Sequence, residues 1–394
     1  MFELEEVTSQ EAASGTTVIK VIGVGGAGGN AVEHMIREGV GGVEFICCNT
    51  DSQALDKSSA HVKLQLGPGL GAGGKPDKAK ELAQADRVRI AEALEGAHMV
   101  FITAGMGGGT GTGAGPVIAE VARELGILTV AVVTKPFEYE GRRKRLAEEG
   151  VTELEKHVDS LIVILNEKLE EVLGDDVSML DAFKAADNVL RNAVGGIAEI
   201  INVPGLVNVD FEDVRTVMGE MGKAMMGSAV ASGVDRARIA AEEAVASPLL
   251  EGIELSGARG VLVNITASNT LGLKEYKDVM NTIRQYTAAE ATVICGAVFD
   301  ESMQDQLRVT VVATGLGAIS SKARKPEVKV VETIGLRTGT DGFHVVDNTM
   351  GQVDLSSVAS SLRSSMPRNS QAEAMAASGV DKYDIPAFLR RQSD

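Results

Sequence analysis

The segment that most restricts the fold is a run of seven residues, Gly107 to Gly113, made of five glycines and two threonines. An apolar stretch with strand character (99–105) precedes it, and an amphipathic stretch with helical spacing (116–126) follows it. Glycines let backbone N–H groups face inward, and the start of the helix adds partial positive charge. Such a loop can bind phosphate oxygens with few cations, and Thr110 and Thr112 can add hydroxyl donors. The alternative, a flexible hinge, is disfavoured by the well-defined elements on both sides.

Strand and helix patterns alternate through the first half of the chain. The predicted strands are short, apolar and β-rich, and they cover 17–26, 43–51, 99–105, 128–134 and 159–166. Helical patterns lie between several of them, which predicts an α/β fold with a parallel, doubly wound sheet. Such sheets bind ligands beyond the carboxyl ends of their strands, and the glycine clusters of this chain are expected there.

Changes in pattern divide the chain into six parts. We predict an N-terminal tail (1–16), an α/β domain (17–177), a central connecting helix (178–204), a second α+β domain (205–318), a flexible linker (319–381) and a C-terminal docking peptide (382–394). Ser178 is the expected N-cap of the central helix, with Asp181 three residues later. Within the second domain, helical patterns cover 213–227 and 235–250, and strand patterns cover 260–267, 291–300 and 307–317.

Composition argues against several classes of protein. The formal net charge of -17 at pH 7 disfavours nucleic-acid binding, because phosphates require basic surface. The N-terminus lacks the apolar region of a signal peptide, and no apolar run approaches the roughly 20 residues that span a bilayer. Cys47, Cys48 and Cys295 lack metal-like spacing, which predicts buried, reduced thiols and no fixed metal ligands. We therefore expect a cytoplasmic protein that neither binds nucleic acid nor inserts into a membrane.

Two further glycine clusters are candidate binding loops. Residues 23–28 form G-x-G-x-x-G between a strand and a helix pattern, and Asp51 follows at the spacing of dinucleotide-binding folds. A glycine turn needed only for close packing is the alternative there. The cluster 67–76 is not a P-loop, because Pro76 stands where that motif has Ser or Thr. Three glycine loops from one parallel sheet are best explained by one polyphosphate held from several sides.

Two charged segments complete the set of candidates. Asn208, Asp210 and Asp213 follow the central helix and could position a water molecule or a cation. A solvated acidic turn is the alternative. The basic run 142–145, which follows Glu140, could bring a cation to the phosphates, or it could be an exposed basic face.

Taken together, these motifs resemble the tubulin/FtsZ family of bacterial cell-division GTPases. The resemblance rests on GGGTGTG after a strand, IGVGGAGGNAV, NTD, GLGAG, NVDFEDV, GARGVLVNIT, VTVVATGLG and the C-terminal YDIPAFLRRQSD. It covers residues 17–318 almost continuously, and then the last dozen. It implies a tubulin-like fold with a Rossmann-like GTP-binding domain over 17–177. It also implies hydrolysis of GTP to GDP and phosphate, with Mg²⁺ bound together with the nucleotide.

The resemblance also implies roles for individual residues. The implied nucleotide-binding residues are Gly26, Ala27, Gly28, Gly29, Asn30, Asn49, Asp51, Ala72, Gly73, Gly107, Gly108, Gly109, Thr110, Gly111, Thr112, Gly113, Glu140, Arg143, Asn166, Phe183 and Asp187. Of these, Asn166, Phe183 and Asp187 would contact guanine. The implied catalytic residues, Asn208, Asp210 and Asp213, would complete the active site of the neighbouring subunit. Hydrolysis would then require head-to-tail filaments.

Partners and location follow from the same resemblance. The implied docking residues for membrane-tethering division proteins are Asp384, Ile385, Pro386, Phe388 and Leu389. Division inhibitors and regulators would be further partners. The implied location is the cytokinetic ring at mid-cell, beneath the inner membrane.

The chain also departs from the family pattern. The loop 67–76, whose Ala72 and Gly73 would approach the terminal phosphate, is shorter than usual. The family's arginine after Glu140 falls on Arg143 or Lys144, and we prefer Arg143 because a lysine lacks the bidentate fork. Leu165 replaces the usual proline. Two alternative functions stay open at this point, a GTP-binding filament with little hydrolysis and a Rossmann-type dinucleotide oxidoreductase.

Overall fold

A computed structural model of the chain describes residues 17–174, 178–202, 209–220, 222–247, 257–288 and 290–316, with residues 170–173 described by their backbone alone. The predicted N-terminal tail, linker and docking peptide lie outside these residues. So do Asn208 and the five docking residues Asp384, Ile385, Pro386, Phe388 and Leu389. Predictions that concern them therefore stay predictions.

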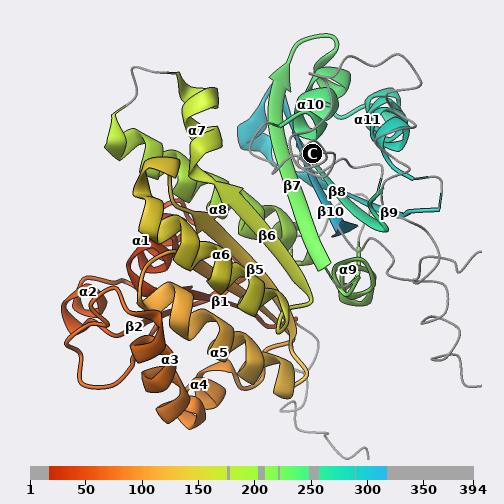
Figure 1. Cartoon of the computed structure of the whole chain (residues 1–394). Coiled ribbons are helices and arrows are strands. Elements are labelled where there is room, and N and C mark those ends of the chain that lie inside the picture. The colour runs from red at the N-terminus through yellow and green to blue at the C-terminus, as the bar shows by residue number, and fades with distance from the viewer. Residues whose placement is uncertain are drawn as a thin grey trace, which may run out of the picture. The chain divides into compact units, whose positions relative to one another are not determined.

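Ten strands of the described residues form one continuous sheet in the order β3-β2-β1-β4-β5-β6-β7-β10-β8-β9 (Figure 1). The strands are β1 (Ile19–Val24), β2 (Glu44–Asn49), β3 (Val62–Gln65), β4 (Met99–Gly105), β5 (Leu128–Lys135), β6 (Ser160–Leu165), β7 (Gly222–Ser232), β8 (Gly260–Ala267), β9 (Thr292–Phe299) and β10 (Gln306–Leu316). All pairs from β3 to β7 are parallel, whereas β10 is antiparallel to both β7 and β8. The predicted α/β fold with a parallel sheet is thus confirmed.

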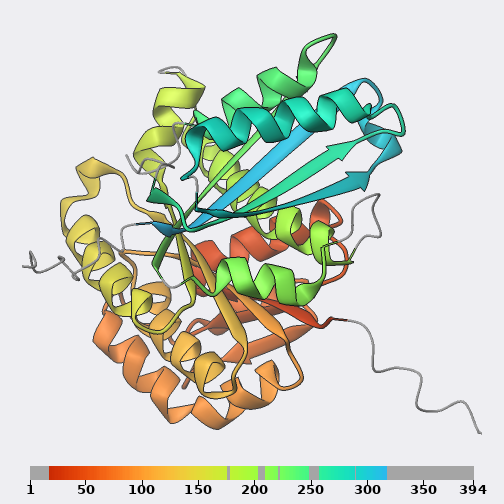
Figure 2. The same ribbon diagram turned by 90° about the vertical axis from the view of Figure 1, so that its right-hand side faces the viewer.

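Helices cover both faces of this sheet. They are α1 (Gly25–Arg37), α2 (Ser52–Asp56), α3 (Pro76–Ala85), α4 (Arg87–Leu94), α5 (Thr110–Glu124), α6 (Gly141–Glu155), α7 (Asn166–Leu173), α8 (Met179–Asn202), α9 (Phe211–Met218), α10 (Arg236–Val245) and α11 (Leu273–Tyr286). Helices α1, α8 and α9 share one apolar core on one face, and α3 to α6 share another on the opposite face. A third core lies between β7–β10 and the pair α10 and α11. Figure 2 shows these two helices alongside the teal and blue strands. Coverage on both faces explains why β4 is apolar along nearly its whole length.

The long helix α8 forms as the sequence predicts. Ser178 caps its N-terminus, because the Asp181 N–H donates to Ser178 Oγ at 3.2 Å and Ser178 Oγ donates to Asp181 Oδ2 at 2.6 Å. Leu190, Val194 and Ile197 are buried at helical spacing and belong to the same core as strands from β1 to β10. The helix therefore packs along the sheet on both sides of the β6–β7 pair.

One predicted helix is wrong. The helical pattern over 213–227 breaks into α9, which ends at Met218, and the strand β7, which begins at Gly222. Met225 and Met226 belong to cores on opposite faces of the sheet, which is the alternation of a strand. Alanine and methionine favour helices by themselves, but pairing with β6 and β10 decides the conformation here.

The sheet continues from β6 directly into β7, so the two predicted domains share it. The predicted boundaries near 177 and 205 remain predictions. Among the helices of the described residues, none is long and apolar enough to cross a membrane. Cys47, Cys48 and Cys295 are free and buried, as predicted.

Candidate nucleotide-binding site

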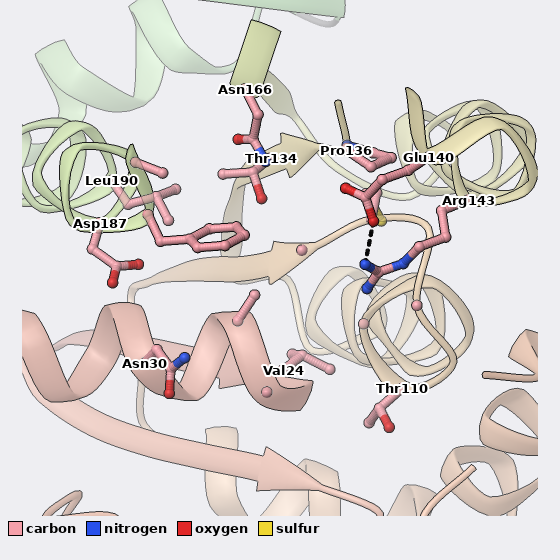
Figure 3. A pocket seen from close by; sticks show the side chains of 18 of the residues that line it. Val24, Asn30, Thr110, Thr134, Pro136, Glu140, Arg143, Asn166, Asp187 and Leu190 are labelled. Carbon is pink, nitrogen blue, oxygen red and sulfur yellow. Dashed lines mark hydrogen bonds and ion pairs between the residues drawn. The ribbon is translucent and has the colours of Figure 1, made fainter. Parts of the chain in front are cut away.

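A cavity of about 450 Å³ opens beyond the carboxyl ends of β1, β4 and β5, between the N-termini of α1 and α5 and the first turns of α8 (Figure 3). Twelve of the residues proposed as nucleotide contacts line it, namely Gly26, Ala27, Asn30, Gly108, Gly109, Thr110, Gly111, Glu140, Arg143, Asn166, Phe183 and Asp187. The cavity thus lies where a parallel sheet is expected to bind its ligand.

One wall is formed by residues 106–113, which comprise the loop between β4 and α5 and the first turn of α5, and which we call the phosphate loop. Gly107 has a φ of 92°, and a Cβ atom there would lie 2.5 Å from the Arg143 carbonyl oxygen, so only glycine fits. The Gly107 N–H donates to the buried Thr112 Oγ1 at 2.9 Å. Thr110 lines the cavity at the first residue of α5, and its hydroxyl is 2.7 Å from the Thr50 hydroxyl. Thr112 therefore braces the loop from within, whereas Thr110 faces the cavity.

Helix α1 forms the second wall and follows β1 without a connecting loop. Gly25 begins the helix with a φ of 75°, which is the left-handed conformation that glycine adopts readily. Gly26, Ala27 and Asn30 line the cavity. Gly28 does not line it, because its backbone packs against the Thr103 carbonyl of β4. The first glycine cluster therefore serves both uses, close packing and cavity wall.

The far end of the cavity carries acceptors and an aromatic ring. Asn166 is buried, and its Oδ1 atom has no hydrogen-bond partner within the described part of the chain. Burial raises the pKa of the Asp187 carboxyl to about 6, while His34 and Arg37 act in the opposite direction. The Phe183 ring stands edge-on to Phe137 at a centroid distance of 6.2 Å. Two acceptors beside a ring suit guanine, which presents neighbouring N–H donors on N1 and N2.

An ion pair between Glu140 and Arg143 stands at the side of the cavity (Figure 3). Both residues line it, and both are in the predicted set. Lys144, the alternative to Arg143, does not line it and forms an ion pair with Glu138 at 2.6 Å. The geometry therefore favours Arg143.

Several predicted contacts lie around the cavity without lining it. Ala72 is buried against the phosphate loop, and Gly73 is exposed next to it. Asn49 and Gly29 line a smaller cavity of about 260 Å³ beside α1. Asp51 caps α2, where its Oδ1 accepts from the Gln53 N–H at 3.0 Å. The remaining four, Gly28, Gly107, Thr112 and Gly113, also lie outside the lining.

The acidic pair after α8 is far from this cavity. Asp210 caps α9, because its Oδ1 accepts from the Asp213 N–H at 2.8 Å, and both residues are exposed. The cavity lining extends along α8 only as far as Leu190, which leaves about 18 Å of helix, at about 1.5 Å per residue, between the cavity at the first end and Asn202 at the second end. A carboxylate beyond the second end cannot reach a ligand at the first.

Sequence reasoning missed seven lining residues, Val24, Gly105, Met106, Thr134, Pro136, Ala186 and Leu190. A usable signal existed for some of them. Ala186 and Leu190 lie on the helix face that Phe183 and Asp187 define by spacing. Thr134 lies near the carboxyl end of β5 and Pro136 follows that strand, at the same sheet edge as the glycine loops.

Fold and cavity together indicate a nucleotide-binding α/β protein. Comparison with known families agrees. Residues 18–174 match the GTPase domain of the Tubulin/FtsZ family, and residues 222–317 match the C-terminal domain of the FtsZ family.

Individual relatives give the same result. The chain is 54% identical over 407 residues to the cell division protein FtsZ of Pseudomonas aeruginosa, and 53% identical over 405 residues to that of Azotobacter vinelandii, with 100% of each chain covered. A solved structure of an empty FtsZ dimer from M. jannaschii has a TM-score of 0.73 and 43% identity, over 76% of this chain and 88% of that one. CetZ2 of Haloferax volcanii, at 20% identity and a TM-score of 0.66 over 77% of this chain and 94% of that one, shares the fold.

The chain therefore belongs to the FtsZ family, and it is a GTP-binding GTPase of cell division. Membership contradicts the alternative of a dinucleotide oxidoreductase. The position of Asp51 agrees, because it caps α2 outside the main cavity.

Proposed function

We propose that this GTPase hydrolyses GTP only between subunits, within head-to-tail filaments that build the cytokinetic ring at mid-cell beneath the inner membrane. Guanine lies against Phe183, Asn166 and Asp187, and the phosphates lie on the phosphate loop and the start of α1. Asn208, Asp210 and Asp213 of the next subunit complete the site. The observation that carries this proposal is the distance of Asp210 and Asp213 from the cavity of their own chain, along the length of α8.

The chemistry that this arrangement supports is mainly positioning. Backbone N–H groups of the phosphate loop and the hydroxyl of Thr110 hold phosphate oxygens, while a carboxylate from the next subunit orients the attacking water. The water then attacks the terminal phosphorus in line with the bond to GDP, and no covalent enzyme intermediate is needed. Among the described residues no group of three His, Cys, Asp or Glu side chains could hold a metal ion. Mg²⁺ bound with the nucleotide would be held through the phosphates and water, where it would neutralise phosphate charge.

An exposed apolar rim around the cavity supports contact with a second subunit. Tyr139, Met179 and Leu180 are 69%, 58% and 64% exposed, and Phe183 is also exposed. The Tyr139 hydroxyl donates to Met179 Sδ at 3.7 Å, and the Tyr139 ring stacks on Phe137 at 5.3 Å. Large apolar side chains gathered at the mouth of a polar cavity are typical of an interaction surface. A contact between two different surfaces generates an open filament when its rotation does not close into a ring.

A mixing experiment tests the shared site. Asp213→Ala removes a carboxylate and should lower hydrolysis roughly 100-fold or more while GTP still binds. Gly107→Val blocks the phosphate loop, because a side chain there meets the Arg143 carbonyl. Neither variant alone should hydrolyse GTP at an appreciable rate. In an equimolar mixture, about a quarter of the contacts combine an intact cavity with an intact loop, so about a quarter of wild-type activity should return.

The control is Asp235→Ala, which removes an exposed aspartate at the start of α10 that makes no capping hydrogen bond. It should hydrolyse GTP like wild type. No recovery in the mixture, with both variants folded and co-assembling, would show that each chain contains a complete site. Phosphate release should also rise per molecule above a threshold protein concentration. Release per molecule that is independent of concentration would contradict the filament requirement.

The tail gives a separate proposal. We propose that residues 382–394 dock on membrane-tethering division proteins through Ile385, Phe388 and Leu389, and that division inhibitors and regulators also bind this chain. Apolar residues at i, i+3 and i+4 suit one helical face in a groove. Deletion of 383–394 should leave hydrolysis intact and abolish recruitment to anchored partners. Recruitment that is unchanged by the deletion would refute the docking role.

A further inference from the structure

Lys75 lies where the glycine loop 67–75 meets the phosphate loop. A Cβ atom built on Gly109 would lie 2.8 Å from Ala72 Cβ and 3.1 Å from Lys75 N, so the two loops are in direct contact. Gly109 itself lines the cavity. The Lys75 N–H donates to the Ala72 carbonyl at 3.3 Å, which holds the backbone of Lys75 beside the cavity wall.

The loop 67–75 is also fixed from its other side. The Gly71 N–H donates to the Thr50 carbonyl at 2.8 Å, and the Ser52 N–H donates to the Gly69 carbonyl at 3.0 Å. A Cβ atom on Gly73 or Gly74 would meet no atom within 4 Å, so the space in front of the last residues of the loop is open. The loop is therefore open at the two residues that precede Lys75.

The Lys75 side chain is exposed, and among the residues that the structure describes it has no hydrogen-bond or ion-pair partner. Four neighbouring cations do have partners. These pairs are Lys78 with the Gly71 carbonyl (3.0 Å), Lys80 with Glu153 (3.6 Å), Lys144 with Glu138 (2.6 Å) and Arg143 with Glu140. Lys75 is thus available to a ligand, whereas each of the others would first have to give up a contact.

A cation at this position would balance the negative charge of a bound phosphate. The formal net charge of the chain is -17, and the backbone of the phosphate loop offers only partial charges. The terminal phosphate of a nucleoside triphosphate carries the extra negative charge that distinguishes it from the diphosphate. A lysine ammonium is a compact charge on a flexible stem, and it binds phosphate without a fixed geometry.

We propose that the Lys75 ammonium group binds the terminal phosphate of the nucleoside triphosphate and so sets the preference for triphosphate over diphosphate. The inference rests on the proposed placement of the nucleotide in this cavity with its phosphates on the phosphate loop. It assigns Lys75 a specificity function that is separate from guanine recognition. The contact is lost when the terminal phosphate leaves, so it distinguishes substrate from product.

The test measures binding of a non-hydrolysable GTP analogue and of GDP to full-length protein, kept below its assembly concentration. Lys75→Gln removes the charge and keeps most of the length. It should weaken binding of the analogue roughly tenfold and leave GDP binding unchanged. Lys75→Arg should restore the preference. The matched control is Lys80→Gln, which removes the same charge from α3 at a residue paired with Glu153.

The outcomes separate the two proposals. Equal weakening of analogue and GDP in Lys75→Gln would refute the inference, because it would report a deformed loop or a general loss of charge. Unchanged binding of both would refute it as well. Nucleotide binding that is unchanged by Asp187→Ala would instead refute the proposed site, because the nucleotide would then bind outside this cavity. An analogue-specific loss that becomes smaller as salt is raised supports the inference.

Discussion

Replacing Asp187 by asparagine should make the nucleotide-free protein more stable and, at the same time, weaken its binding of GTP. Asp187 lies on α8 in the wall of the cavity, and burial raises the pKa of its carboxyl from 3.8 to about 6. The ionised form is therefore disfavoured in the empty cavity. Asparagine has nearly the same shape and no charge, so it avoids the cost of desolvating a carboxylate.

The magnitude follows from the pKa. The pKa of the Asp187 carboxyl is about 6 in the folded chain and 3.8 in the unfolded chain. At 1.36 kcal/mol per pKa unit, this difference sets an upper limit of about 3 kcal/mol on the cost of the charge. Because the side chain is only half-buried, solvent screening reduces that cost to roughly 1 kcal/mol. For a chain of this size, the gain corresponds to a rise of about 2 °C in Tm.

The sign of the pH dependence is fixed by the same shift. The folded pKa is raised, so the contribution of Asp187 to stability is fully present below the unfolded value near 3.8 and is lost as the pH rises through about 6. The Tm advantage of Asp187→Asn over wild type should therefore be largest above pH 7 and shrink as the pH falls below 6. Binding of GTP should weaken roughly tenfold in the variant, because the guanine N–H donors lose a charged acceptor.

The assay is thermal unfolding of nucleotide-free protein between pH 5.5 and 8, with calorimetric titration of GTP at pH 7.5. The control is Asp181→Asn on the same helix. Hydrogen bonds from Ser178 and then from Lys184 lower the pKa of the Asp181 carboxyl, so this variant should lose stability at neutral pH. A lower Tm for nucleotide-free Asp187→Asn at pH 7.5, or a Tm difference that does not change with pH, would refute the reasoning.

Two further predictions concern single side chains. Ser178→Ala removes the N-cap of α8 and should cost about 1 kcal/mol of the free energy of unfolding, seen as a lower urea midpoint with an unchanged slope. An unchanged midpoint would show that the cap does not contribute. Arg143→Ala should weaken binding of GTP, whereas Lys144→Ala, which breaks only an exposed pair with Glu138, should leave it unchanged. The reverse order in a nucleotide titration would assign the cation to Lys144.

The elements around the cavity could be predicted from sequence because their signals are local. The strand before Gly107 is a continuous apolar run, and α8 combines a capping residue with helical spacing from Ser178 onward. These features depend on neighbours in the chain, which sequence reasoning sees directly. The strand β7 was missed for the opposite reason. Met225 and Met226 are held in a strand by β6 and β10, which are distant in sequence.

Part of the site was beyond pattern analysis in the same way. Asp51 stands at the spacing of a dinucleotide-binding acid, yet it caps α2. The choice between Arg143 and Lys144 required knowledge of which side of α6 faces the cavity. Lys75 contacts Gly109 and so connects two glycine loops. The sequence alone does not show that these two loops lie close together.

The short parallel pairing between β6 and β7 has a mechanical consequence. These strands meet only through Ser160–Ile162 and Gly222–Ala224, whereas β8 and β9 pair along their whole length. A load across the sheet concentrates at this seam, because fewer hydrogen bonds carry it there. Helix α8 lies across the β6–β7 pair, and its buried face belongs to a core that the strands on both sides share, so it stabilises the sheet at this point. Under tension or bending the sheet would yield first at β6–β7, with α8 limiting how far the two halves can turn.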